Sequence, residues 1–269
     1  MVQDILLAAP LYLLVAARTA GLIFTLPLFS MRTVSRVAKI ALVGYVSYIL
    51  MVQTVFSRYG SIIEGDGAFS IYYAFLILGE GMIGVIMGFY VSVIFAAFSS
   101  AAQFFAFQMG FTAASTYDQL SQVENPLLGQ FFNFAAVLIF LQNHWFQIIF
   151  LKGLKSSFSS ITVFDFIRDQ NGVVSFLLKG LTNLFADAFV ISLPVMGTLV
   201  LITVCTGLLS KAAPQMNLLS EGFPVMILLA FGLLIWIFPA LCEFFFRSFN
   251  TGLTELFNMI RLSGAGGAS

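Results

Sequence analysis

Charged side chains are scarce in this chain, and their scarcity excludes most classes of soluble protein. Only 9% of the 269 residues are Asp, Glu, Lys or Arg, whereas soluble domains carry about 25%. Apolar residues make up 60% of the chain, and its mean hydropathy is +1.01. The 12 basic and 12 acidic residues leave no net charge, which argues against a nucleic-acid partner. The composition therefore predicts an integral membrane protein.

Residues that carry catalytic or metal chemistry are also few. His144 is the one histidine of the sequence, so neither a Ser–His–Asp triad nor a multi-histidine metal site is expected. Its place beside Trp145 at a segment end predicts an interfacial position. Cys205 and Cys242 lie far apart in apolar runs, so we interpret them as small buried hydrophobic residues. There is no phosphate-binding loop motif and no polar catalytic cluster. We expect no enzyme activity, cofactor or metal.

Six long apolar segments stand out along the chain. They cover about residues 5–29, 38–57, 68–105, 127–151, 173–209 and 222–242, with a break expected at 152–172. Pro27, Pro194 and Pro239 lie inside or near the ends of such segments, where proline bends a helix. We predict an all-α, membrane-type protein of kinked helical hairpins. One domain is expected over 1–262, followed by a flexible tail at 263–269.

The stretch from Gly81 to Tyr117 contains no charged residue. As one helix it would run about 55 Å, against a hydrocarbon core of about 30 Å. We expect a helix to about Phe105 and an irregular segment over 106–117, which mixes amides and hydroxyls with aromatic and small residues. Irregular backbone at that depth needs protein or a water-filled cavity around it. The segment is either a pore-closing loop or a buried turn between helices. Its candidate plug residues are Phe107, Gln108, Met109, Gly110, Phe111 and Tyr117.

A row of small residues repeats at every fourth position of the third segment. It consists of Gly84, Gly88, Ser92, Ala96 and Ser100. Such rows let two helix backbones approach closely in lipid. The row therefore predicts a helix-packing face, with a transport pathway as the alternative.

Three charged residues lie inside or near the ends of apolar segments: Arg18, Glu80 and Asp187. A lone charge near the middle of a bilayer costs at least about 2.5–3.5 kcal/mol, so such residues usually find partners. We expect them to pair with one another or with neighbouring subunits. The functional alternative is a proton relay.

Four segments, in order, resemble the FliR family of flagellar export-gate proteins, whose counterparts serve injectisome type III secretion. The most specific is the run GLLSKAAPQMNLLSEGFP at Gly207–Pro224. The others are Ala17–Gly21 with Pro27–Phe29, Gly79–Gly84, and Phe107–Gly110 with Asn125–Pro126 and Gly129–Gln130. The match extends from about Leu11 to Phe257, and the polar run Tyr117–Glu124 departs from it.

The resemblance implies a non-enzymatic subunit of the flagellar type III protein export gate. It implies a FliP-like part over about 1–185 and a FliQ-like hairpin over about 186–262. The residues of the hairpin loop would be Lys211, Pro214, Gln215, Asn217, Gly222 and Pro224. FliP-like and FliQ-like subunits would join the chain in a closed helical assembly, with an FlhB-like subunit outside.

The same resemblance implies a role and a location. The central loop would help to plug the channel through which unfolded flagellar proteins pass. The expected location is the bacterial inner membrane, in lipid contact, as a multi-pass protein of the flagellar basal body. The alternative function is a small proton-coupled secondary transporter that uses Glu80 and Asp187. A transporter would be expected to have an internal hydropathy repeat, which the sequence does not display.

Overall fold

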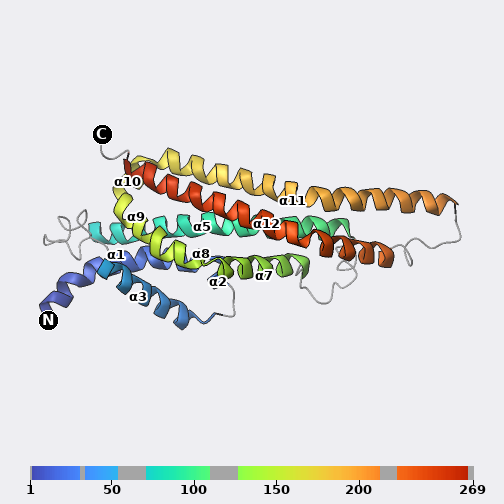
Figure 1. Ribbon diagram of the computed structural model, residues 1–269. Helices are drawn as coiled ribbons and strands as arrows, with labels where there is room; N and C mark the ends of the chain where they lie inside the picture. The colour runs from blue at the N-terminus through green and yellow to red at the C-terminus, as the bar shows by residue number, and fades with distance from the viewer. Residues whose placement is uncertain (1, 31–33, 54–70, 110–126, 213–222, 266–269) are drawn as a thin grey trace. The chain divides into compact units, whose positions relative to one another are not determined.

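The computed structural model describes residues 2–30, 34–53, 71–109, 127–212 and 223–265, and these residues form helices joined by short turns (Figure 1). The predicted all-α class is therefore confirmed. The helices are α1 (Val2–Thr25), α2 (Pro27–Ser30), α3 (Arg36–Gln53), α5 (Ile71–Gln108), α7 (Leu127–Gln142), α8 (Trp145–Gln147), the π-helix η1 (Ile148–Gly153), α9 (Leu154–Ser160), α10 (Val163–Arg168), α11 (Gln170–Ala212) and α12 (Phe223–Ala265).

Three of these helices, α5, α11 and α12, are long and apolar enough to cross a membrane. They have 38, 43 and 43 residues. The number of spans in the described residues rises to four if the helices on either side of the break before Trp145 count as one broken span. The membrane-type architecture is thus present, while the six-segment organisation stays a prediction.

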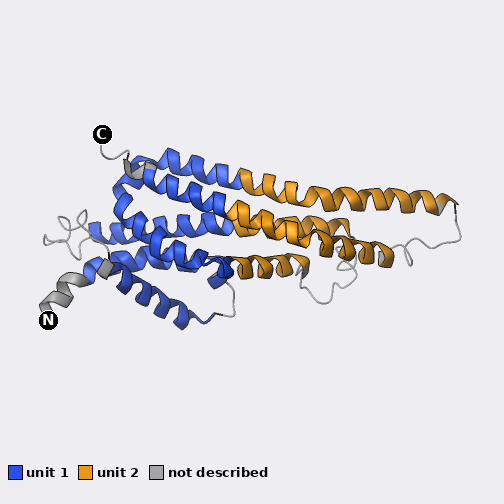
Figure 2. Ribbon diagram, viewed as in Figure 1, with its two compact units in different colours: residues 1–93, 140–181, 250–269 blue, residues 94–139, 182–249 orange. Residues whose placement is uncertain are grey.

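The chain forms two compact units (Figure 2). Unit 1 comprises residues 1–93, 140–181 and 250–269, and unit 2 comprises residues 94–139 and 182–249. The boundary cuts across α5, α11 and α12, so each long helix contributes to both units. This partition differs from the division at about residue 185 into FliP-like and FliQ-like parts, which stays a prediction.

The core of unit 1 forms where α1 packs against α3 and α5. Its apolar residues include Leu14, Val15 and Leu22 from α1, Val43 and Leu50 from α3, and Ile83 and Met87 from α5. Two tyrosines link the helices, because Tyr12 donates a hydrogen bond to the Gly44 carbonyl and Tyr73 donates one to the Pro10 carbonyl. The backbone of α1 is thereby fixed to both neighbours.

Phenylalanine rings fill the core of unit 2. Phe98 lies with its ring centroid 5.0 Å from that of Phe132 and 4.9 Å from that of Phe245. Phe95 adds edge contacts to Phe245 and Phe249 at 5.6 and 5.9 Å. Offset and edge-on rings at these separations are the favourable geometries for aromatic pairs. The 32 phenylalanines of the sequence supply the rings for this mode of packing.

Helices α11 and α12 form an antiparallel pair, shown in Figure 1. Within unit 1, Lys179 contacts Glu255. Within unit 2, Asp187 contacts Ser248, and Thr203 lies 3.7 Å from the sulfur of Met226. The partner numbers fall as the first numbers rise, so the C-terminal part of the chain is a helical hairpin.

Several segment ends were predicted wrongly. Helix α5 continues through Ala106–Gln108, where irregular backbone was expected. The Met109 amide still bonds to the Phe105 carbonyl at 2.9 Å, and Ala106 and Met109 are buried, so core packing favours another turn of helix. Likewise α12 includes residues 263–265 of the expected tail.

The region from 127 to 172 also differs from prediction. The segment expected over 127–151 is interrupted at His144, which adopts a left-handed backbone conformation with φ 54°. The break expected over 152–172 is mostly helical, because α9, α10 and the start of α11 lie within it. These short helices have buried apolar residues, including Leu154 and Val163, which pack in the core. The polar residues between them made the region look like a loop in the sequence.

The prolines and cysteines complete the comparison. Pro27 begins α2 directly after a bend at Leu26, as its missing amide hydrogen favours. Pro194 lies inside the continuous helix α11.

Cys205 is exposed on α11 and Cys242 is partly exposed on α12, so the expectation of two buried thiols was wrong. Much of this apolar hairpin has no cover within the described chain.

Candidate functional site

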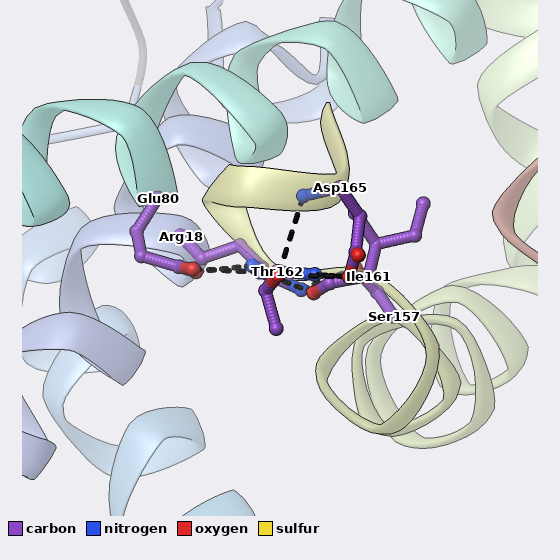
Figure 3. A network of polar contacts seen from close by, with 6 residues as sticks. All are labelled: Arg18, Glu80, Ser157, Ile161, Thr162 and Asp165. Atoms are coloured by element: carbon purple, nitrogen blue, oxygen red, sulfur yellow. Dashed lines mark hydrogen bonds and ion pairs between the residues drawn. The ribbon is translucent and has the colours of Figure 1, made fainter. Parts of the chain in front are cut away.

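A buried ion pair joins α1 to α5 in unit 1 (Figure 3). The Arg18 Nε lies 2.5 Å from Glu80 Oε2, and Nη2 lies 2.9 Å from Oε1. Both side chains are 0% exposed. The planar guanidinium thus holds both carboxylate oxygens at once, the strongest geometry for such a pair.

Two of the three remaining N–H donors of Arg18 are also bonded. Its Nη1 donates to Ser157 Oγ at 2.7 Å, and Nη2 donates to the Ile161 carbonyl at 3.0 Å. The guanidinium carbon lies 4.2 Å from the centroid of the Phe158 ring. One side chain therefore links α1, α5, α9 and the turn after α9. Because its charge is neutralised and four of its five N–H donors are bonded, this Arg18 network fixes helices in place, and both carboxylate oxygens of Glu80 are held by Arg18.

The turn that offers the Ile161 carbonyl is built locally. Ile161 has extended backbone angles, which end α9. Thr162 then caps α10: its hydroxyl accepts a hydrogen bond from the Asp165 amide, and its amide donates to Asp165 Oδ2 at 3.0 Å. This reciprocal arrangement is a capping box. It fixes the direction of the chain where Arg18 binds it (Figure 3).

A close seam of α1 against α5 surrounds the ion pair. A Cβ added to Gly84 would lie within 3.0 Å of the Arg18 carbonyl group, and one added to Gly88 would lie within 3.0 Å of Thr25 and of the Leu22 carbonyl oxygen. Gly21, on α1, meets the α5 backbone equally closely. The first half of the predicted small-residue row therefore lies where two backbones touch.

The rest of that row behaves differently along α5. Ser92 donates to the Thr25 carbonyl at 2.6 Å and so closes the seam in unit 1. Ala96 is exposed and Ser100 is partly exposed, and both belong to unit 2. The row thus packs against α1 from Gly84 to Ser92, whereas Ala96 and Ser100 do not belong to this seam.

A second polar cluster joins α5, α11 and α12 in unit 1. The Tyr90 hydroxyl donates to Glu255 Oε2 at 3.0 Å, and Lys179 Nζ lies 3.3 Å from Glu255 Oε1. The Tyr90 ring stacks on Phe176 at 4.4 Å and lies against Gly180. This cluster attaches the base of the C-terminal hairpin to α5, and sequence analysis missed it.

Asp187, the third charged residue singled out, lies in unit 2, whereas Arg18 and Glu80 lie in unit 1. Its Oδ2 accepts a hydrogen bond from the Ser248 hydroxyl at 2.6 Å. Sequence analysis did not identify Ser248, because a serine within an apolar helix carries no pairing signal.

The candidate plug residues are described only in part. Phe107 is 69% exposed, Gln108 is partly exposed, and Met109 is fully buried, all at the end of α5. Gly110, Phe111 and Tyr117 lie outside the described residues. In the hairpin loop, Lys211 is exposed near the end of α11 and Pro224 is exposed in the first turn of α12. Pro214, Gln215, Asn217 and Gly222 lie outside the described residues.

The described residues contain no group of three or more side chains that could hold a metal ion. His144 is exposed, while the neighbouring Trp145 is 3% exposed and packs against Phe140 with ring centroids 6.2 Å apart. Trp145 is thus a core residue of unit 1.

The fold and these sites define a membrane-type helical protein whose buried polar groups hold its helices together. The chain belongs to the FliR family: residues 9–252 match the family described as bacterial export proteins, family 1. Similar proteins include the flagellar biosynthetic protein FliR of Borreliella burgdorferi, 31% identical over 71% of each chain. FliR of Bacillus subtilis is 28% identical over 95% of this chain and 96% of its own. The surface presentation of antigens protein SpaR of Shigella sonnei is 29% identical over 79% of each chain.

Family membership makes the chain a membrane component of a flagellar or type III export apparatus. The residues of the Arg18 network, Arg18, Glu80 and Ser157, all lie within the region that matches the family.

Proposed function

We propose that this chain is a non-enzymatic subunit of the flagellar type III protein export gate. In the assembled gate it forms part of a closed channel together with FliP-like and FliQ-like subunits, and an FlhB-like subunit packs outside. The observation that carries the proposal is the contrast between its two kinds of surface. The charges of Arg18 and Glu80 are paired within the chain, whereas the hairpin of α11 and α12 exposes long apolar faces.

The exposed faces are extensive enough to require cover. On α11 they include Leu201, Val204 and Leu208, which are 54–66% exposed, and on α12 they include Ile235 and Trp236, which are 76% and 82% exposed. Contiguous apolar surface of this kind marks contact with a membrane or with other subunits. A FliQ-like hairpin within a ring of similar hairpins would cover it.

The plug role is proposed for the segment from Phe107 to Tyr117. Aromatic rings, a flexible thioether and Gly110 form a soft closure that seals against ions and yields to an unfolded chain. Phe107 is exposed at the end of α5, where the segment begins.

A proton-coupled transporter is supported less well. It would need Glu80 to take up and release a proton, yet both oxygens of that carboxylate are held by Arg18. Protonation of Glu80 would leave the buried charge of Arg18 uncompensated, which is strongly unfavourable.

The test is export in the native host. Deleting the gene should abolish secretion of flagellar hook and filament proteins into the medium, and the wild-type gene should restore it. The secreted proteins are detected by immunoblot, with their intracellular levels as the control for synthesis. Normal secretion in the deletion strain would contradict the proposed function.

A further inference from the structure

We infer that Asp187 forms an ion pair with a lysine or arginine side chain of a neighbouring subunit. This inference rests on the proposed function, because it requires that the chain works inside an assembly. Among the described acidic residues of unit 2, Asp187 is the one that no base of that unit contacts.

The other acidic residues of the three long helices each have a cation. Glu80 binds Arg18, Glu255 binds Lys179, and Glu243 binds Arg247 four residues later on α12. Within the described residues of unit 2, Asp187 contacts no base. Its one hydrogen bond there is the 2.6 Å bond from the Ser248 hydroxyl to Oδ2, which leaves Oδ1 without a donor.

The bases that share its helix and its unit cannot reach it. Lys179, two turns earlier on α11, is already bound to Glu255. Arg247 is bound to Glu243 on an exposed face, with 2.5 Å between Nη2 and Oε1. Lys211 lies about 36 Å further along α11 at 1.5 Å per residue. Since neither Asp187's own helix nor the rest of unit 2 supplies a cation, we assign that cation to another chain.

The surroundings of Asp187 make an unpaired carboxylate costly. It is partly exposed, and the neighbouring outward residues of α11 are apolar: Phe185, Phe189 and Val190 are 67%, 53% and 54% exposed. In lipid, such a charge is retained where it faces protein or water and has a partner. The same apolar residues offer the contact surface on which a partner helix would present its base.

The hydrogen bond from Ser248 fixes the position of the Asp187 carboxyl group. A serine hydroxyl that donates to Oδ2 satisfies one lone pair of the carboxylate and keeps the group in the seam between α11 and α12. The second oxygen remains available for the incoming cation. Arg18 and Glu80 show the same chemistry within the chain.

A hydrophobic carbodiimide tests the inference directly. Dicyclohexylcarbodiimide adds to carboxyl groups that take a proton in an apolar environment, and a carboxylate in an ion pair resists it. The probe is applied to the isolated chain in detergent and to the complex with its FliP-like and FliQ-like partners, and the labelled peptide is quantified by mass spectrometry. Glu80 is the internal control, because it is paired in both samples.

Labelling of Asp187 in the isolated chain should fall at least about tenfold in the complex, the change that a pairing free energy of about 1.4 kcal/mol produces. Equal labelling in both samples would overturn the inference, because Asp187 would then be a neutral acid held by Ser248. Failure of the complex to form would instead contradict the proposed function, so the two failures are distinguishable.

Variants supply the second measurement. Asp187→Asn should lower the yield of complex, and Asp187→Glu should retain most of it, since the charge is kept. Glu243→Gln is the matched control, because it removes a carboxylate of the same unit that already has its cation on the same helix. If Asp187→Asn and Glu243→Gln assemble equally well, the ion pair between subunits is contradicted.

Discussion

At the residue scale, Arg18 links three elements of unit 1 to α1: helix α5, helix α9 and the turn after α9. Its guanidinium makes four hydrogen bonds, to Glu80, Ser157 and the Ile161 carbonyl. A buried ion pair contributes little net stability when compared with a well-packed apolar pair, but breaking it from one side costs about 3–5 kcal/mol. Its role is to specify how three helices meet.

The first prediction concerns this pair. Arg18→Met and Glu80→Leu should each destabilise the protein by about 3–5 kcal/mol, because each leaves one buried charge unpaired. The double variant should recover much of that loss, since both charges are then gone. Thermal unfolding of the purified proteins in detergent gives the coupling through a double-mutant cycle.

Exchanging the two charges should recover less than the apolar double variant. A carboxylate at position 18 would face the Ile161 carbonyl, which now accepts a hydrogen bond from Arg18. Additive losses throughout the cycle would contradict an energetic link between Arg18 and Glu80.

His144 provides a second prediction at the residue scale. Its φ of 54° places a non-glycine residue in the left-handed region between α7 and α8, and its side chain is exposed. Because this conformation costs an ordinary residue about 1–2 kcal/mol, His144→Gly should unfold at the same or a higher temperature than the wild type. His144→Val should unfold at a lower temperature, since a β-branched residue tolerates positive φ worst. Equal melting temperatures for the Gly and Val variants would show that the backbone strain is absent.

At the scale of elements, the seam between α1 and α5 brings two helix backbones into direct contact in unit 1. Gly84 and Gly88 on α5 and Gly21 on α1 each leave no room for a Cβ. Close backbone approach maximises dispersion contact in lipid, where exclusion of water supplies no driving force. The seam also brings Arg18 within reach of Glu80.

The third prediction concerns Gly88. Gly88→Leu should destabilise the protein by at least about 1–3 kcal/mol and prevent its copurification with partner subunits, because a side chain there meets Thr25 and Leu22. Membrane insertion should remain intact. Gly197→Leu, on α11, is the matched control for the stability of the isolated chain, since a Cβ at that helical glycine meets nothing within 4 Å. Copurification of Gly88→Leu at wild-type level would rule out the seam.

The fourth prediction concerns the plug segment. Deleting Gly110–Ser115 should leave a complex that assembles but conducts ions, because the segment closes the path without holding the subunits together. Conductance in planar bilayers, wild-type complex against deletion complex, measures the effect. If the deletion instead blocks assembly without any leak, the segment is a buried turn.

For both the seam and the Arg18 network, sequence patterns identified some of the contacting residues and missed their partners. Gly84 and Gly88 stand four residues apart, so their spacing marks a face of α5, but spacing within one helix does not reveal that Gly21 and Thr25 lie opposite. Arg18 and Glu80 were visible because charge is rare in apolar segments. Ser157 and the Ile161 carbonyl carry no comparable signal.

One further feature could have been predicted from a local pattern, and another could not. Thr162 and Asp165 stand at the spacing of a capping box and mark the start of α10 inside what seemed to be a loop. The ion pair of Lys179 with Glu255 joins residues far apart in sequence, and only the antiparallel pairing of α11 with α12 brings them together. Such long-range pairs follow from topology, which single-sequence patterns leave open.

At the scale of the whole molecule, the protein combines a buried ion pair in unit 1 with uncovered apolar helix faces. In unit 2, helices α11 and α12 expose large apolar residues such as Leu208 and Trp236. A protein that worked alone would keep such faces toward lipid, whereas a gate subunit buries them against its neighbours. Membership of the FliR family supports the second arrangement.

The central claim is that this chain is completed by other subunits, and native mass spectrometry tests it most directly. The chain is co-expressed with the FliP-like and FliQ-like chains of its host, purified in mild detergent and weighed intact. We predict one species that contains this chain together with several copies of both partners. Recovery of this chain alone, with both partners expressed and inserted in the same membrane, would contradict the account.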